Sequence, residues 1–210
     1  MLYENDYHYG GVLMNINCDY SCKNRINSSY IKWLVEILGP VILGSKPSEI
    51  LNISLSDNNK EYKINEIKLF FKNCSRLSYE IIYKENGEIK VLFMNKNVLS
   101  KIFDDKKCVN FLKFIGYPSN YDLNNYINFL IERLKDNNFP HEIGVFLGYP
   151  LKDVVGFMGY GNYKLQKTKY WRVYGNVEVS DEIYNRFLID RQRMRKLLEN
   201  KPLEKIRNVV

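Results

Sequence analysis

The chain has 210 residues, of which 45% are hydrophobic and 26% are charged, and its formal net charge is +7. This balance excludes an intrinsically disordered chain, because disorder accompanies low hydrophobicity and a high density of like charge. The length suits one domain with a substantial core. The charge is uneven, since residues 160–210 hold 12 basic and 6 acidic side chains, whereas residues 1–159 hold 19 and 18.

Signals for export, for a membrane span and for a metal are absent from the sequence. The first eight residues include acids and lack the basic start and apolar core of a signal peptide. The apolar run over 33–44 is too short to cross a bilayer and contains Glu36 and Pro40. Four cysteines in this length do not make a disulfide framework, and no Cys and His residues cluster at metal-ligand spacing. We therefore expect a cytoplasmic protein with no metal, no cofactor and no membrane partner.

The first third of the chain predicts a loose segment followed by two helices. Residues 1–28 are polar and are interpreted as a loosely ordered lead-in. Residues 31–38 have helical apolar spacing, and this helix should end near Gly39-Pro40 because proline disfavours helical geometry in the residue before it. Asn65 is placed to cap a second helix, whose apolar residues recur at helical spacing over 67–77.

The pair Asn86-Gly87 marks the clearest local structure in the sequence. The segments on either side, 79–85 and 88–94, are rich in β-branched and aromatic residues. An Asn-Gly pair between such segments favours a two-residue type I′ hairpin turn. The pairs that this register forms are Ile82 with Val91 and Ile81 with Leu92. Because both faces of the hairpin are then apolar, we expect both to be covered.

The second half of the chain predicts helices interspersed with short strands. The predicted helices are 97–103, 109–115, 122–135 and 150–158. The compact apolar run 143–147 is predicted as a buried strand because it is short for a helix, and 170–174 as another strand. Ser180 is placed to cap the last helix. On that helix we expect Phe187 and Leu188 to be buried and Arg191, Arg193 and Arg195 to be exposed.

These elements predict an α+β fold, with a mixed or antiparallel sheet that includes one β-hairpin and packs against several helices. We expect a single domain over 29–200. A basic tail over 201–210 should follow it.

A dense motif spans 139–157, with the sequence Phe-Pro-His-Glu-Ile-Gly-Val-Phe-Leu-Gly-Tyr-Pro-Leu-Lys-Asp-Val-Val-Gly-Phe. A Pro-Val-Ile-Leu-Gly-Ser-Lys-Pro element at 40–47 precedes it, and Tyr-Trp-Arg-Val-Tyr-Gly at 170–175 follows it. With the hairpin, these segments resemble the signature of DUF3793, a family of unknown function from anaerobic Gram-positive bacteria. In many members of that family a cysteine or selenocysteine stands two residues before the first proline, where this chain has Leu38. The resemblance therefore implies no redox role for this position.

The candidate catalytic residues are His141, Glu142 and Asp153. A histidine titrates near neutral pH, and a neighbouring carboxylate could assist it in acid–base chemistry. Neighbouring residues of a strand point to opposite faces, however, so His141 and Glu142 would not cooperate directly. An extended span of eight residues would also place His141 and Tyr149 about 20 Å apart. These expectations favour a structural role for His141 over a catalytic one.

The candidate ligand-binding residues are Lys46, Tyr149 and Trp171. Lys46 lies near an expected helix start, where an anion could bind. The two aromatic residues belong to a cluster of tyrosines and basic residues over 149–174. Such interleaving can grip single-stranded nucleic acid, and it is also typical of a strand half-buried against a helix.

Three functions are compatible with these patterns. The favoured hypothesis is a non-catalytic accessory or interaction domain with an unknown protein partner, since motifs for nucleotides and catalytic nucleophiles are missing. The second is a small-molecule-binding protein or an enzyme with a site around His141. The third, less favoured, is nucleic-acid binding through the basic C-terminal region. Convergence of His141 and Asp153 on one concave pocket would favour the second hypothesis.

Overall fold

The computed structural model describes residues 29–72, 74–200 and 203. Its central element is a three-stranded antiparallel sheet in the order β1-β3-β2, and β4 and β5 pair as a second small sheet. The strands are β1 (Ser48–Ile53), β2 (Ser78–Tyr83), β3 (Ile89–Met94), β4 (Leu165–Thr168) and β5 (Arg172–Tyr174). The helices are α1 (Ser29–Ile37), α2 (Gly39–Leu43), α3 (Lys60–Phe70), α4 (Lys96–Phe103), α5 (Lys106–Phe114), α6 (Leu123–Lys135), α7 (Ile143–Phe146), α8 (Leu151–Phe157) and α9 (Glu178–Asn200). The predicted α+β fold is confirmed.

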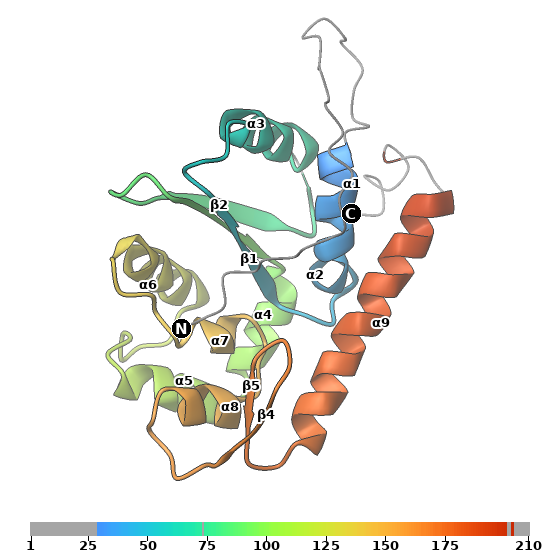
Figure 1. Ribbon diagram of the computed structural model, residues 1–210. Helices are drawn as coiled ribbons and strands as arrows, with labels where there is room; N and C mark the ends of the chain where they lie inside the picture. The colour runs from blue at the N-terminus through green and yellow to red at the C-terminus, as the bar shows by residue number, and fades with distance from the viewer. Residues whose placement is uncertain (1–28, 73, 201–202, 204–210) are drawn as a thin grey trace, which may run out of the picture.

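Helices cover both faces of the three-stranded sheet (Figure 1). The central strand β3 is buried along its whole length. Its residues Ile89, Val91 and Phe93 belong to the core formed with α1, α2 and α3. Leu92 and Met94 belong to the opposite core, formed with α4 to α8. The prediction that the hairpin is covered on both sides is therefore confirmed.

The hairpin turn is one residue longer than predicted. The Gly87 N–H donates to the Lys84 carbonyl at 2.9 Å, and a three-residue loop connects the strands. Gly87 has a φ of 81°, the left-handed conformation that closes such loops with a bulge. The extra residue shifts the register by one, so that Ile81 lies opposite Val91 and the predicted Ile82–Val91 pair is wrong.

Two predicted helix caps lie inside their helices. The helix α3 begins at Lys60, so Asn65 is an internal residue and not its N-cap. The helix α9 begins at Glu178, which places Ser180 in its first turn. The last helix was located apart from its first residues, which are the least certain part of a helix assignment. The helix predicted over 67–77 is misplaced, because α3 ends at Phe70 and contains only the start of that range.

The helix α9 lies along α1 and α2, at the right of Figure 1. Phe187 is buried as predicted, whereas Leu188 is 37% exposed and its predicted burial is wrong. Arg193 and Arg195 are exposed, and Arg191 is half-buried. Within the described ranges no helix is long and apolar enough to cross a membrane. The expected lead-in over 1–28 and most of the expected tail lie outside the described residues.

The run predicted as a buried strand over 143–147 is helical, and that prediction is wrong. The Leu147 N–H donates to the Ile143 carbonyl at 2.8 Å, which is a helical bond. Gly148 then ends the turn with a φ of 77°. A short apolar segment that is buried on all sides carries no periodicity, so its sequence does not separate a strand from a helix. Packing of α7 against α4 and α8 decides the outcome.

Candidate functional site

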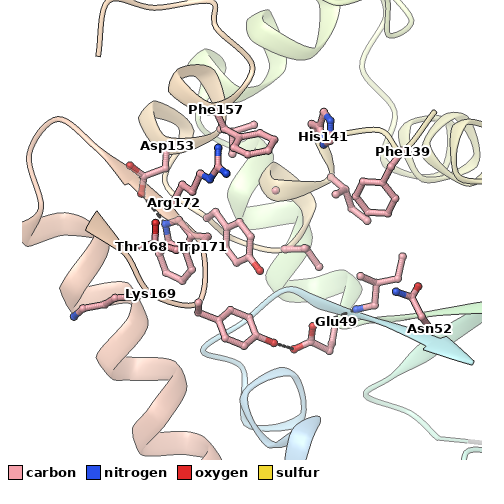
Figure 2. Close-up of a pocket in the computed structure, with 17 residues that line it drawn as sticks. Glu49, Asn52, Phe139, His141, Asp153, Phe157, Thr168, Lys169, Trp171 and Arg172 are labelled. Carbon is pink, nitrogen blue, oxygen red and sulfur yellow. Dashed lines mark hydrogen bonds between the residues drawn. The ribbon is translucent and has the colours of Figure 1, made fainter. Parts of the chain in front are cut away.

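A cavity of about 190 Å³ opens where three parts of the chain meet: β1, the 139–157 segment and the connection between β4 and β5 (Figure 2). Its polar lining residues are Glu49, Asn52, His141, Asp153, Thr168, Lys169 and Arg172. Its aromatic lining residues are Phe139, Tyr149, Phe157, Tyr170 and Trp171. The structure therefore brings four of the six sequence-based candidates to one cavity.

The helical geometry of α7 makes this convergence possible. A helix rises about 1.5 Å per residue and a strand more than twice as much, so the expected separation of about 20 Å between His141 and Tyr149 does not apply. Gly144 faces α8, where an added Cβ would lie 2.8 Å from the Val154 side chain. Its missing side chain lets α7 and α8 pack closely. His141 and Tyr149 consequently line the same cavity.

Asp153 is 2% exposed, and both of its carboxylate oxygens are engaged. Oδ1 accepts hydrogen bonds from Lys152 Nζ at 2.7 Å and from the Tyr174 N–H at 2.8 Å. Oδ2 accepts from Trp171 Nε1 at 2.8 Å and from Ser180 Oγ at 2.7 Å. The bonds from Trp171, Tyr174 and Ser180 join α8 to the β5 region and to α9. Together with the bond from Lys152, they use the acceptor sites that a ligand would need.

Tyr149 stacks on Trp171, with ring centroids 4.4 Å apart and planes inclined by 17°. Lys46 supports this wall from behind, since its Nζ lies 5.7 Å from the Tyr149 ring and 5.0 Å from the Tyr170 ring. It also forms a buried ion pair with Glu49 at 2.7 Å. Lys46 is only 1% exposed and precedes β1, not a helix. It fixes lining residues and does not itself line the cavity.

Phe157 has His141 on one side and Arg172 on the other (Figure 2). The His141 ring meets it edge-on at 4.9 Å, and the Arg172 guanidinium lies 5.5 Å from its centroid. Partial burial lowers the pKa of His141, so its imidazole is mainly neutral at pH 7. The Arg172 side chain forms no ion pair with any described acid. Among the charged and titratable side chains of the lining, these two have no acid partner in the described ranges, whereas Glu49, Asp153 and Lys169 are paired.

Glu142 does not line the cavity. It is 0% exposed, and its Oε1 lies 2.5 Å from Arg133 Nε and accepts from the Tyr117 hydroxyl at 3.2 Å. Burial and the nearby carboxylate raise the pKa of Tyr117, so the phenol stays protonated and donates. Glu142 thereby anchors the start of α7 to α6 and to the segment after α5, and it does not share a site with His141.

Three arginines in the second half of α9 are engaged within the fold. Arg191 and Arg195 both pair with Glu36 of α1, at 3.3 and 2.7 Å. Arg193 pairs with Asp190 one turn earlier, at 2.9 Å. These bonds fasten α9 to α1 and neutralise part of the charge that suggested nucleic-acid binding.

Two further kinds of site, a metal site and a thiol site at position 38, are not formed by the residues that the structure describes. Among these residues, no three His, Cys, Asp or Glu side chains lie close enough together to hold a metal ion. Leu38, the position for which the resemblance raised thiol chemistry, is fully buried in the core with α1 and α3. Sequence reasoning missed Glu49, Arg172 and Phe157. For Glu49 the sequence held no signal, because its contact with the Tyr170 hydroxyl at 3.5 Å spans 121 positions.

The family model described as "Protein of unknown function (DUF3793)" matches residues 34–208. This range includes every residue that lines the cavity. No curated protein and no solved structure matches the chain. Because the match covers most of its length, the chain belongs to the DUF3793 family of proteins of unknown function.

Proposed function

We propose that this protein is a non-catalytic domain that binds a compact small molecule in the cavity beside His141. The observation that carries the proposal is an aromatic-walled cavity in which His141 and Arg172 lack an acid partner among the described residues. Mostly apolar pockets with a few convergent polar groups are the usual form of small-molecule sites. The volume of about 190 Å³ is below that of pockets for drug-sized ligands, so the ligand is small.

The walls of the cavity are held by bonds that need no ligand. Asp153 positions the Trp171 indole, and Trp171 in turn supports the Tyr149 ring by stacking. Lys46 holds the Glu49 carboxylate. A site fixed in this way loses little conformational entropy when a ligand binds, which favours affinity.

The same bonds favour binding over catalysis. A general base needs a free lone pair within reach of the substrate. Asp153 already accepts four hydrogen bonds, and Glu49 is paired with Lys46. His141 contacts the rings of Phe139 and Phe157 and has no described carboxylate bonded to it as an orienting group. The protein would therefore be non-catalytic, as the favoured hypothesis from the sequence has it, and would bind a small molecule near His141, as the second hypothesis has it.

The proposed binding unit is one domain over 29–200. The lining of the cavity runs from Glu49 to Arg172, and α9 supplies Ser180 to the bonds around Asp153. A shorter part of the chain would leave the site incomplete. The proposed cytoplasmic location rests on the sequence alone.

The test is to identify what the protein retains when it is purified from its own cells. Native mass spectrometry would detect a bound compound, and extraction would release it for identification. The variant Thr168→Trp places a large ring at the cavity, and Gln166→Trp makes the same change on the same strand outside it. We expect wild type and Gln166→Trp to carry the same compound and Thr168→Trp to carry less than a tenth as much. Equal retention by a folded Thr168→Trp, or no retention by wild type, would contradict the proposal.

A further inference from the structure

We infer that the ligand of this cavity is a small planar anion, a single aromatic or conjugated ring that carries one carboxylate or phosphate group. The inference rests on the proposed function, because it names the ligand class of the same site. It follows from the charges that remain uncompensated in the cavity, from the geometry of Arg172 and from the shape of the walls.

The acids of the lining are already neutralised. Glu49 is paired with Lys46 at 2.7 Å, and this ion pair is almost completely buried. Asp153 is paired with Lys152, also at 2.7 Å. A cationic ligand would have to compete with these lysines for carboxylates that are well bonded. The cavity therefore offers little to attract a positive charge.

The cations of the lining differ from one another. Lys169 is paired with Asp181 at 2.9 Å, and its side chain points away from the centre of the cavity in Figure 2. Arg172 has no acid partner in the described ranges. One positive charge is thus left uncompensated where the cavity opens. An anion that reached it would gain a charge-assisted bond without breaking an existing ion pair.

The position of Arg172 suits an oxyanion. Its guanidinium lies over the Phe157 ring, 5.5 Å from the centroid. Because no described acid pairs with this guanidinium, its N–H groups are available, and their planar fork matches the two oxygens of a carboxylate or phosphate. His141 approaches the same ring at 4.9 Å, and a neutral imidazole keeps one N–H donor. His141 and Arg172 therefore present N–H donors on opposite sides of Phe157, and the anionic group of the ligand is assigned to Arg172.

The remaining walls favour a flat ligand. The rings of Phe139, Phe157, Tyr149 and Tyr170 line the cavity, and planar rings pack against one another in stacked or edge-on arrangements. The volume of about 190 Å³ suits a body of about one ring with its substituents. A ligand held by its anionic group at Arg172 would place this ring among the aromatic walls.

The cavity contains its own reporter. The chain has two tryptophans, and one of them, Trp33, is 46% exposed on α1 and does not line the cavity. The variant Trp33→Phe leaves Trp171 as the single tryptophan, so its emission reports events at the cavity wall. We would titrate this variant with benzoate, phenyl phosphate, neutral benzamide and cationic benzamidine.

We expect benzoate or phenyl phosphate to change Trp171 emission saturably, at concentrations at least about tenfold lower than benzamide or benzamidine require. The better of the two anions distinguishes a carboxylate from a phosphate. In the same background, Arg172→Gln should weaken anion binding at least about tenfold. Arg172→Lys should weaken it less, because lysine keeps the positive charge but lacks the paired N–H donors of a guanidinium. Arg193→Gln, an exposed change on α9, should leave binding unchanged.

Two outcomes of the titration distinguish an error in the ligand class from an error in the proposed binding function. Saturable binding of benzamide or benzamidine as tight as that of the anions, or anion binding unaffected by Arg172→Gln, would overturn the anionic ligand class and leave the binding cavity in place. The absence of a saturable response to all four compounds, in a protein with an intact melting temperature, would overturn both.

Discussion

The indole Nε1 of Trp171 donates to Asp153 Oδ2 at 2.8 Å, and this bond sets one wall of the cavity. It joins the connection before β5 to α8, two elements that the sequence places 18 positions apart. The Tyr149 ring stacks on this indole, so a buried carboxylate whose acceptor sites are already occupied sets the position of two aromatic lining residues.

Replacing Asp153 by asparagine should destabilise the fold. The amide would present N–H groups to a site where four donors converge, leaving buried polar groups without partners. We expect Asp153→Asn to lower the free energy of unfolding by about 2–4 kcal/mol in urea titrations. Glu132→Gln is the control, since it breaks an exposed ion pair with Lys135 and should cost less than about 1 kcal/mol. Equal stability of the two variants would refute the structural role of Asp153.

Replacing Gly87 by alanine tests the hairpin turn. Gly87 has a φ of 81°, which lies in the left-handed region. An alanine held in this conformation should lower the free energy of unfolding by about 1–2 kcal/mol. An added Cβ would also approach the Leu55 side chain to 2.6 Å. Glu85→Ala changes an exposed residue of the same loop and should be nearly neutral. Thermal unfolding of the two variants measures the difference, and a Gly87→Ala protein as stable as Glu85→Ala would show that the turn has another conformation.

The attachment of α9 to α1 should depend on pH through Glu36. Burial alone would raise the pKa of Glu36, but the hydrogen bonds and charges of Arg195 and Arg191 outweigh it and lower the pKa. A carboxyl whose pKa is lowered by folding stabilises the fold fully above its ordinary pKa of about 4.3. That contribution is lost as the pH falls through the lower value of the folded state.

The variant that measures this effect is Glu36→Gln. It should be less stable than wild type by about 1 kcal/mol or less near pH 7, because the pairs are partly exposed. The difference should shrink as the pH falls below about 4. Urea titrations over that pH range give both curves, and a difference that stays constant into acid would argue against the assigned ion pairs.

Met194 tests whether α9 is an integral part of the fold. Its side chain is 0% exposed, and its Cβ lies 2.6 Å from the place where a Gly39 side chain would begin. Met194→Ala should therefore cost about 2–5 kcal/mol, as for other large core residues. Ile189→Ala, on the same helix but 47% exposed, should cost much less. Equal melting temperatures for the two variants would mean that α9 is a separate arm, and would strengthen the nucleic-acid hypothesis.

Local patterns in the sequence located most of the helices and the hairpin. The helices predicted over 97–103, 109–115 and 122–135 lie close to α4, α5 and α6. Their first turns are capped by side chains only a few residues away, as where Asp122 accepts from the Asn125 N–H at 2.8 Å. Bonds of this kind form within one turn, so the sequence alone determines them. The same holds for the position of the Asn86-Gly87 turn, although not for its exact length.

The tertiary structure alone decided the state of 143–147 and the composition of the cavity. The apolar run is buried from all sides, so its helical form depends on the elements packed around it and not on its own pattern. The contact between Glu49 and Tyr170 spans 121 positions, and Arg172 reaches Phe157 from a different element. Such pairings form only when the whole chain is folded, because no local bond or periodicity encodes which distant side chains will meet. The sequence therefore indicated His141, Tyr149, Asp153 and Trp171 only as separate candidates. The packing of α7, α8 and the β4–β5 connection against β1 placed them around one cavity.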